Sequence, residues 1–179
     1  MGRYYYLIVR KLFWFARVIL KMRRMAKDPG ETEESTYKYL QGVVDVMKKT
    51  THTRTEVFGL ENLPKEGGYV MYPNHQGKYD AYSIVSVHDK PCTVVMDKAK
   101  SYDLFINQVI DLVDGKRMDK EDVRQSLGII MEVTKEVAQG RHYILFPEGE
   151  YDKDKHNSLW DLRQDALKHP RNPRHRWCR

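Results

Sequence analysis

Apolar and polar positions follow two different patterns along this chain, and the pattern changes near residue 50. Residues 3–25 repeat apolar side chains at helical spacing, and residues 33–49 do so again. Residues 28–30, Asp-Pro-Gly, separate the two stretches and are typical of a helix end. The first fifty residues therefore predict an N-terminal pair of amphipathic helices.

The rest of the chain alternates short apolar runs with helical patterns. Residues 79–87 and 120–138 have helical length and periodicity, and Gly140 ends the second. This alternation predicts an α/β fold, mostly sheet with covering helices, preceded by the helical pair. The apolar runs with the length of strands are Thr55–Phe58, Tyr69–Tyr72, Thr93–Met96, Val109–Val113 and Tyr143–Phe146.

The charge is distributed unevenly over the 179 residues, which are enough for one domain with a core. The net charge is +6, but residues 1–27 carry eight Lys or Arg and no acid. Residues 160–179 add a net +4, so the stretch between is acidic, at −6. An acidic middle argues against a nucleic-acid partner. We therefore divide the chain into a helical pair (1–50), an α/β core (51–159) and an atypical basic tail (160–179).

The first helix carries its bases on one stripe, next to a wide apolar face that includes aromatic side chains such as Trp14. A helix of this kind is typical of a membrane surface with anionic lipids. The alternative is a helix that packs on its own domain and leaves a solvated basic stripe. No uncharged apolar run approaches the ~20 residues of a spanning helix. The stripe consists of Arg3, Arg10, Arg17, Lys21 and Arg24.

The location follows from the same observations. Cys92 and Cys178 lie too far apart in sequence for a paired motif or a disulfide framework, which suits a reducing compartment. We therefore expect a peripheral protein on the cytoplasmic face of the plasma membrane.

The first candidate for chemistry is NHQGKYD, residues 74–80, which follows a predicted strand and begins a helix. Ligands of α/β sheets bind where strands end and helices begin. An Asp80 carboxylate on one ring nitrogen of His75 would fix the tautomer and leave the other nitrogen to take a proton. The motif holds no Ser or Cys nucleophile, so the nucleophile would be a hydroxyl of the substrate. A purely structural pair or a helix cap remains the alternative.

Two further motifs follow strand candidates. FPEGE, residues 146–150, is either a simple turn or a site where Glu148 orients a polar substrate. DGKRMDKED, residues 114–122, brings Lys116 and Arg117 together, which suits a phosphate but also fits a solvated charge run.

Together these motifs resemble a known family. NHQGKYD matches the NHxxxxD signature, and FPEG the third motif, of the PlsC-like 1-acylglycerol-3-phosphate acyltransferases. VFGLENLP, residues 57–64, resembles the lead-in to the first motif, Arg117 lines up with the arginine of the second, and Leu127 with an apolar position after it. The resemblance covers roughly residues 1–159.

The resemblance implies a function in phospholipid biosynthesis: acyl transfer from acyl-CoA or acyl carrier protein to the hydroxyl of lysophosphatidic acid. His75 would be the general base, oriented by Asp80, and Arg117, next to Lys116, would bind the acceptor phosphate. Glu148 and Gly149 would shape the acceptor site. The chemistry needs no metal and no cofactor besides the acyl donor. Backbone N–H groups near the start of the motif's helix are the candidate donors to the oxyanion.

The end of the chain departs from the family, whose members continue into a further strand with a proline-containing apolar motif. Residues 160–179 are basic and have little apolar periodicity. One hypothesis is a truncated or out-of-frame end, which the other reading frames of the coding DNA would test. The rival is a native basic tail that contacts membrane or RNA. The alternative function is a non-catalytic relative that binds lipids or anions.

Overall fold

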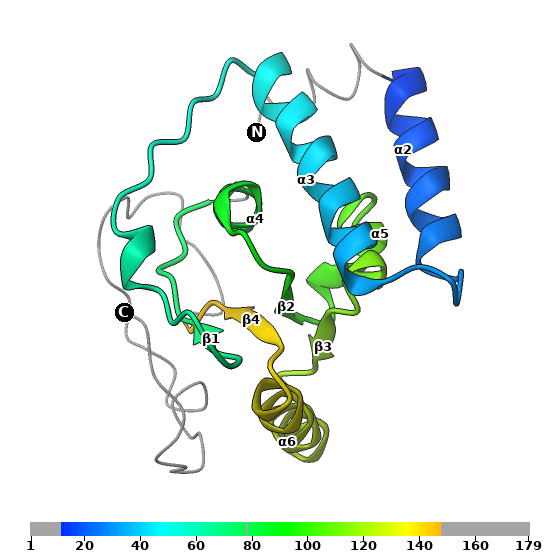
Figure 1. Ribbon diagram of the computed structural model, residues 1–179. Coiled ribbons are helices and arrows are strands. Elements are labelled where there is room, and N and C mark those ends of the chain that lie inside the picture. Colours follow the sequence, from blue (N-terminus) through cyan, green and yellow to red (C-terminus); the bar gives the residue numbers. More distant parts are fainter. Residues whose placement is uncertain (1–11, 78, 148–179) are drawn as a thin grey trace.

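The computed structural model describes residues 12–77 and 79–147, and its centre is a four-stranded parallel sheet in the order β1-β4-β2-β3. Parallel strands all end at the same edge, which we call the carboxyl edge. Figure 1 shows the sheet with one helix, α6, on one side and the other α-helices on the opposite side. The strands are β1 (Val70–Met71), β2 (Cys92–Asp97), β3 (Lys116–Met118) and β4 (His142–Leu145).

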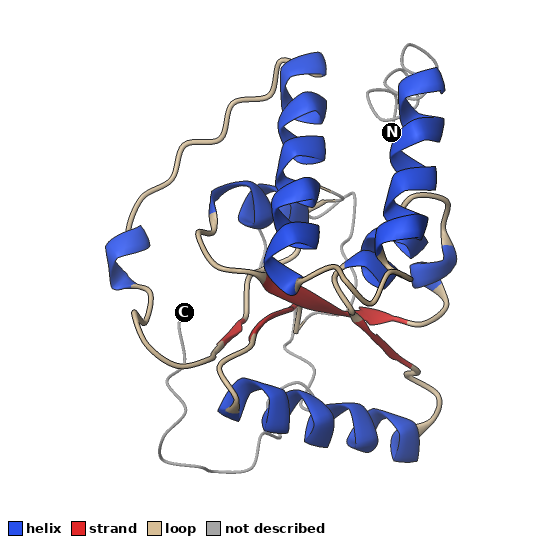
Figure 2. Ribbon diagram, turned by 45° about the vertical axis from the view of Figure 1, so that its right-hand side comes forward, coloured by secondary structure: helices blue, strands red, loops and turns tan. Residues whose placement is uncertain are grey.

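Helices cover both faces of the sheet. In Figure 2, α6 lies alone below the sheet and the other α-helices lie above it. The predicted α/β class and the N-terminal helical pair are confirmed, although helices hold many more of the described residues than strands do. The elements are α2 (Leu12–Met25), α3 (Glu33–Thr50), α4 (Asp80–Val87), α5 (Ile106–Leu112) and α6 (Val123–Ala138), with short 3-10 helices η1 (Leu60–Asn62) and η2 (Lys100–Tyr102).

Three of the five predicted strands are present, as β1, β2 and β4. The prediction for Thr55–Phe58 is wrong: this stretch is a loop, and Phe58 is 89% exposed, so its apolar side chain is not part of the core. The prediction for Val109–Val113 is also wrong, because these residues belong largely to α5 and pack against α2 and α3. A short apolar run fits a buried helix as well as a buried strand.

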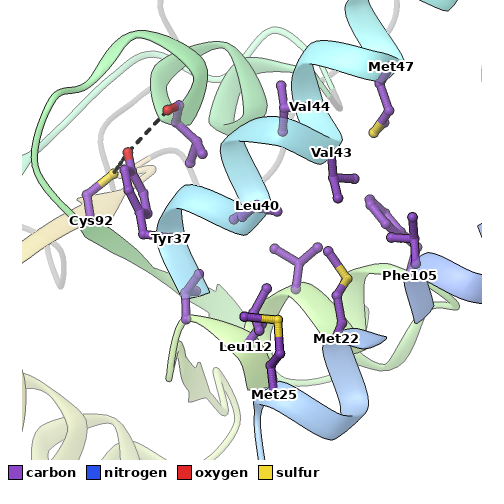
Figure 3. Packing of buried hydrophobic residues seen from close by; sticks show 14 of the residues in the cluster. Met22, Met25, Tyr37, Leu40, Val43, Val44, Met47, Cys92, Phe105 and Leu112 are labelled. Carbon is purple, nitrogen blue, oxygen red and sulfur yellow. Dashed lines mark hydrogen bonds between the residues drawn. The ribbon is translucent and has the colours of Figure 1, made fainter. Parts of the chain in front are cut away.

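The N-terminal helical pair packs on the rest of the domain through one continuous apolar core (Figure 3). The ring centroids of Phe15 and Phe105 are 4.8 Å apart, which joins the first turn of α2 to the start of α5. Each fully buried side chain of this size contributes roughly 1.5–3 kcal/mol. The core includes Phe15, Val18, Met22 and Met25 from α2, Tyr37, Leu40, Val43, Val44 and Met47 from α3, and Val109 and Leu112 from α5.

The other side of α2 faces outward. Phe13 is 88% exposed and Leu20 64% exposed, and the three described bases of the predicted stripe, Arg17, Lys21 and Arg24, are exposed with them. One side of α2 therefore packs on its own domain, as the alternative prediction expected. The opposite side combines exposed apolar and basic side chains.

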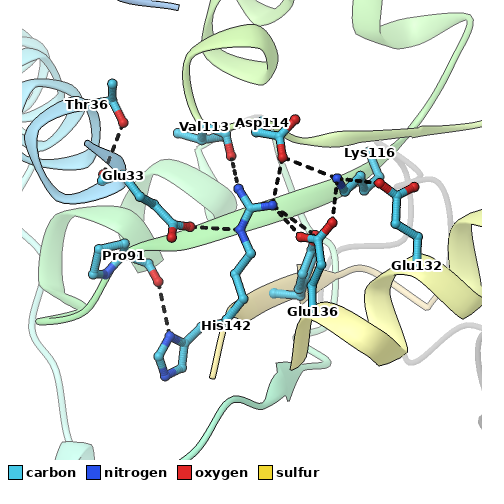
Figure 4. Close-up of polar contacts among 11 residues, drawn as sticks. Glu33, Thr36, Pro91, Val113, Asp114, Lys116, Glu132, Glu136 and His142 are labelled. Atoms are coloured by element: carbon cyan, nitrogen blue, oxygen red, sulfur yellow. Dashed lines mark hydrogen bonds and ion pairs between the residues drawn. The ribbon is translucent and has the colours of Figure 1, made fainter. Parts of the chain in front are cut away.

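A network of ion pairs ties the amino ends of β3 and β4 to α3 and α6 (Figure 4). Arg141 pairs with Glu33 and Asp114 at 2.8 Å each and with Glu136, and Tyr143 donates to Glu136 at 2.6 Å. Since Arg141 precedes β4 and Glu33 begins α3, this network lies at the edge opposite the carboxyl edge.

Candidate active site

The first motif forms a histidine–aspartate pair at the carboxyl edge. His75 lies in the loop after β1, and Asp80 is the first residue of α4. His75 Nδ1 is 2.9 Å from Asp80 Oδ2, so the hydrogen bond that the spacing predicts is present. A carboxylate only accepts, so Nδ1 carries the proton in this contact and Nε2 is the nitrogen that would accept one.

Backbone geometry holds the Asp80 carboxylate in place. Its Oδ2 also accepts hydrogen bonds from Gln76 N at 2.6 Å and Gly77 N at 2.8 Å. Burial raises the pKa of Asp80, but the hydrogen bonds from His75, Gly77 and Gln76 outweigh it and lower the pKa below its usual value. Asp80 is therefore ionised at neutral pH.

These two N–H groups narrow the choice of oxyanion donors expected among backbone groups near the start of the motif's helix. Gln76 N and Gly77 N are both directed at Asp80. They hold the carboxylate that contacts His75. The loop shape needed for this contact could not be derived from the spacing of His75 and Asp80.

The third motif meets the first because β1 and β4 are adjacent. They pair in parallel, with Val70 opposite Tyr143, so the segments that follow them emerge side by side. The rings of Phe146 and His75 are 4.3 Å apart and inclined at 31°, which fixes the imidazole from one face. Glu148 and Gly149, which the resemblance assigns to the acceptor site, lie outside the described residues.

Arg117 is held on the side of β3 that faces α5. Its Nη2 is 2.6 Å from Asp111 Oδ1 and 2.9 Å from Asn107 Oδ1, and its Nε is 3.1 Å from Ser101 Oγ. The guanidinium also lies 5.4 Å from the ring centroid of Tyr102. Nη1 has no hydrogen-bond partner among residues 12–77 and 79–147.

Lys116 points the other way, as neighbouring residues of a strand do. Its Nζ is 2.9 Å from a carboxylate of both Glu132 and Glu136 and 3.2 Å from Asp114, within the ion-pair network at the opposite edge. Its side chain is only 9% exposed. This placement gives Lys116 a structural function, and it does not lie with Arg117.

Two lysines that the sequence analysis did not single out lie just beyond the ends of β2 and β3. Lys98 pairs with Asp119 at 3.2 Å, and Lys120 pairs with Asp97 at 2.7 Å, so the two strand ends are joined crosswise. In the sequence, an Asp-Lys pair stands at the end of each of these two strands. The second pair could not be recognised as a strand end because β3 was not predicted.

Of the residues expected at a membrane surface, Arg3 and Arg10 lie outside the described part and Trp14 is half-buried. None of the described helices combines the length and the apolar character that a membrane-spanning helix requires. Residues 12–77 and 79–147 contain no group of three or more His, Cys, Asp or Glu side chains placed to hold a metal ion.

Comparisons with known proteins point to one family. A Caenorhabditis elegans protein named "Putative 1-acyl-sn-glycerol-3-phosphate acyltransferase acl-2" is 37% identical over 59 residues, which is 33% of this chain and 21% of that protein. No solved structure matches the chain significantly. A family model described as Acyltransferase matches residues 54–169, more than half of the chain. With the PlsC-like resemblance of its motifs, this match shows that the chain belongs to the acyltransferase family.

Proposed function

We propose that this acyltransferase moves a fatty acyl group from acyl-CoA or acyl carrier protein to the hydroxyl of lysophosphatidic acid. The observation that carries the proposal is the His75–Asp80 hydrogen bond at the carboxyl edge, in a chain of this family. The relative's name gives the acceptor class, although the match covers only a fifth of that protein.

The pair supplies general base catalysis. His75 Nε2 takes the proton of the acceptor hydroxyl while its oxygen attacks the thioester carbonyl carbon. The tetrahedral intermediate then breaks its C–S bond, and the leaving thiolate takes the proton from His75. Asp80 stabilises the imidazolium that exists between these steps. An ester and a free thiol are the products, so no other reactant is needed.

Cations at the carboxyl edge would bind the acceptor phosphate. Arg117 offers Nη1, and Lys98 and Lys120 lie beyond the neighbouring strand ends. A charge-assisted hydrogen bond contributes about 1.5–3 kcal/mol, which corresponds to roughly ten- to hundredfold in affinity. We expect Lys120→Met and Arg117→Met each to raise KM for lysophosphatidic acid about tenfold or more.

Steady-state kinetics with two acceptors checks this prediction. The KM for monoacylglycerol, which has no phosphate, should stay near the wild-type value in both variants. Lys135→Met, which removes an exposed lysine of α6, is the matched control. An equal rise in KM for both acceptors would contradict phosphate binding by these cations.

The outward side of α2 would place the enzyme on an anionic membrane surface, at the cytoplasmic face of the plasma membrane. Exposed Phe13 and Leu20 would enter the acyl region while Arg17, Lys21 and Arg24 contact head groups. We expect replacing both Phe13 and Leu20 with Ser to lower co-flotation with phosphatidylglycerol vesicles severalfold. The matched control replaces Val123 and Met131, exposed on α6, with Ser. Equal flotation of the two double variants would argue against this surface.

A further inference from the structure

We propose that α3 positions the catalytic pair by holding the carboxyl end of α4, the helix that begins with Asp80. The residues that act in this way are Gln41 and Tyr37, which we call the α3 clamp. Their function as positioning residues rests on the proposed function of His75 and Asp80. Neither residue belongs to a motif identified in the sequence.

The clamp contacts the backbone where α4 ends. Gln41 Nε2 is 3.0 Å from both Val85 O and His88 O, and the Tyr37 hydroxyl donates to Val85 O at 3.2 Å. The last carbonyls of a helix have no partner within it, so they need donors from outside. The clamp supplies these donors from a neighbouring helix.

The Tyr37 hydroxyl lies in the core and remains a hydrogen-bond donor. It is 3% exposed, and its hydroxyl also lies 3.1 Å from Cys92 Sγ at the start of β2, as Figure 3 shows. Burial, together with Cys92, raises the pKa of Tyr37 far above its usual value. Its hydroxyl therefore keeps its proton at every pH at which the enzyme would work.

The length of α4 links the clamp to the pair. An eight-residue helix is about 12 Å long, so it moves as one rigid body. At its start, α4 is held through the Asp80 carboxylate, which accepts from Gln76 N and Gly77 N, and near the clamped end Lys48 Nζ contacts Ser86 Oγ at 3.1 Å. Loosening the carboxyl end therefore lets the helix tilt about its start, which changes how the Asp80 carboxylate meets His75. A shift of about 1 Å can cost up to a hundredfold in rate.

The clamp should affect turnover more than binding of the acceptor. Lys98 and Lys120, the proposed phosphate ligands, follow the carboxyl ends of β2 and β3, whereas Cys92 is at the opposite end of β2. Gln41→Met keeps the size of the side chain and removes the donor, and Tyr37→Phe removes one hydroxyl. We expect each to lower kcat roughly tenfold and to change KM for lysophosphatidic acid less than twofold.

A spectroscopic readout separates this inference from the proposed function. Ring ¹⁵N shifts of His75 report how much of the Nδ1–H tautomer is present, and this measurement needs no substrate. We expect the Nδ1–H fraction to fall in folded Gln41→Met and Tyr37→Phe. Tyr39→Phe, which also removes a tyrosine hydroxyl from α3, should match wild type. If wild type lacks acyl transfer, the proposed function fails and the ¹⁵N comparison still tests the clamp.

The ¹⁵N measurement and the circular dichroism spectra of the clamp variants decide the inference. A lower Nδ1–H fraction in both clamp variants, with the control unchanged, supports positioning by α3. An unchanged fraction in either variant overturns it. Loss of the native circular dichroism spectrum in either variant also overturns it, because the residue would then be needed only for folding.

Discussion

Replacing Asp80 with Asn is expected to lower kcat for acyl transfer by about a hundred- to ten-thousandfold. The carboxylate accepts from His75 Nδ1 and two backbone N–H groups through one oxygen. The oxygen of an Asn side chain can take the same position and accept these hydrogen bonds, but it carries no negative charge. The imidazolium that forms when His75 Nε2 takes the proton would therefore lose its neighbouring anion, and the transition state would lose stabilisation.

Steady-state kinetics with lysophosphatidic acid measures this effect. Asp45→Asn, an exposed position on α3, provides the same chemical change away from the site. The account is wrong on this point if Asp80→Asn keeps kcat within threefold of wild type. A circular dichroism melt of each variant shows whether a loss of rate reflects a loss of fold.

Arg141→Met is expected to lower the free energy of unfolding by about 3 kcal/mol. Arg141 is 14% exposed and Glu136 is 18% exposed, so removal of the cation leaves buried negative charge with fewer partners. Urea denaturation measures the change. Arg124→Met on the exposed side of α6 should change stability by less than about 0.5 kcal/mol. Equal stabilities of the two variants would show that the network contributes little.

The same network predicts how stability depends on pH. Burial alone would raise the pKa of Glu136, but the hydrogen bonds from Tyr143, Arg141 and Lys116 lower it to about 2. A carboxylate with a depressed pKa stabilises the fold above its unfolded pKa of about 4.3, and this stabilisation is lost as the pH falls toward 2. Wild type should therefore lose more stability than Arg141→Met between pH 5 and pH 2.

Much of the fold follows from periodicity, and its failures have physical causes. Predicted helices at residues 33–49 and 120–138 correspond to α3 and α6, because long amphipathic patterns are unambiguous. The strand β3 was missed since Lys116 and Arg117 are charged; carboxylates from α6 and α5 that are distant in sequence neutralise them. The sequence around a strand does not reveal charge partners that lie on helices elsewhere in the chain.

Contacts of the candidate site that are local in sequence could be predicted, whereas contacts between distant segments could not. The hydrogen bond between His75 and Asp80 could be predicted because a loop and one helix start determine it. The crossed pairs of Lys98 and Lys120 depend on β2 lying beside β3, and the α3 clamp depends on how α3 packs against α4. Neither relation is local in sequence, so each needed the tertiary structure.

The central claim is that His75 is the base of an acyl transfer to lysophosphatidic acid. The most direct measurement is mass spectrometry of phosphatidic acid formed from acyl-CoA and lysophosphatidic acid by wild type, His75→Ala and the control His52→Ala, which removes an exposed histidine outside the motif. The account predicts product from wild type and His52→Ala, and a rate lower by about a thousandfold or more from His75→Ala. Equal product from His75→Ala and wild type, or none from folded wild type, would contradict it.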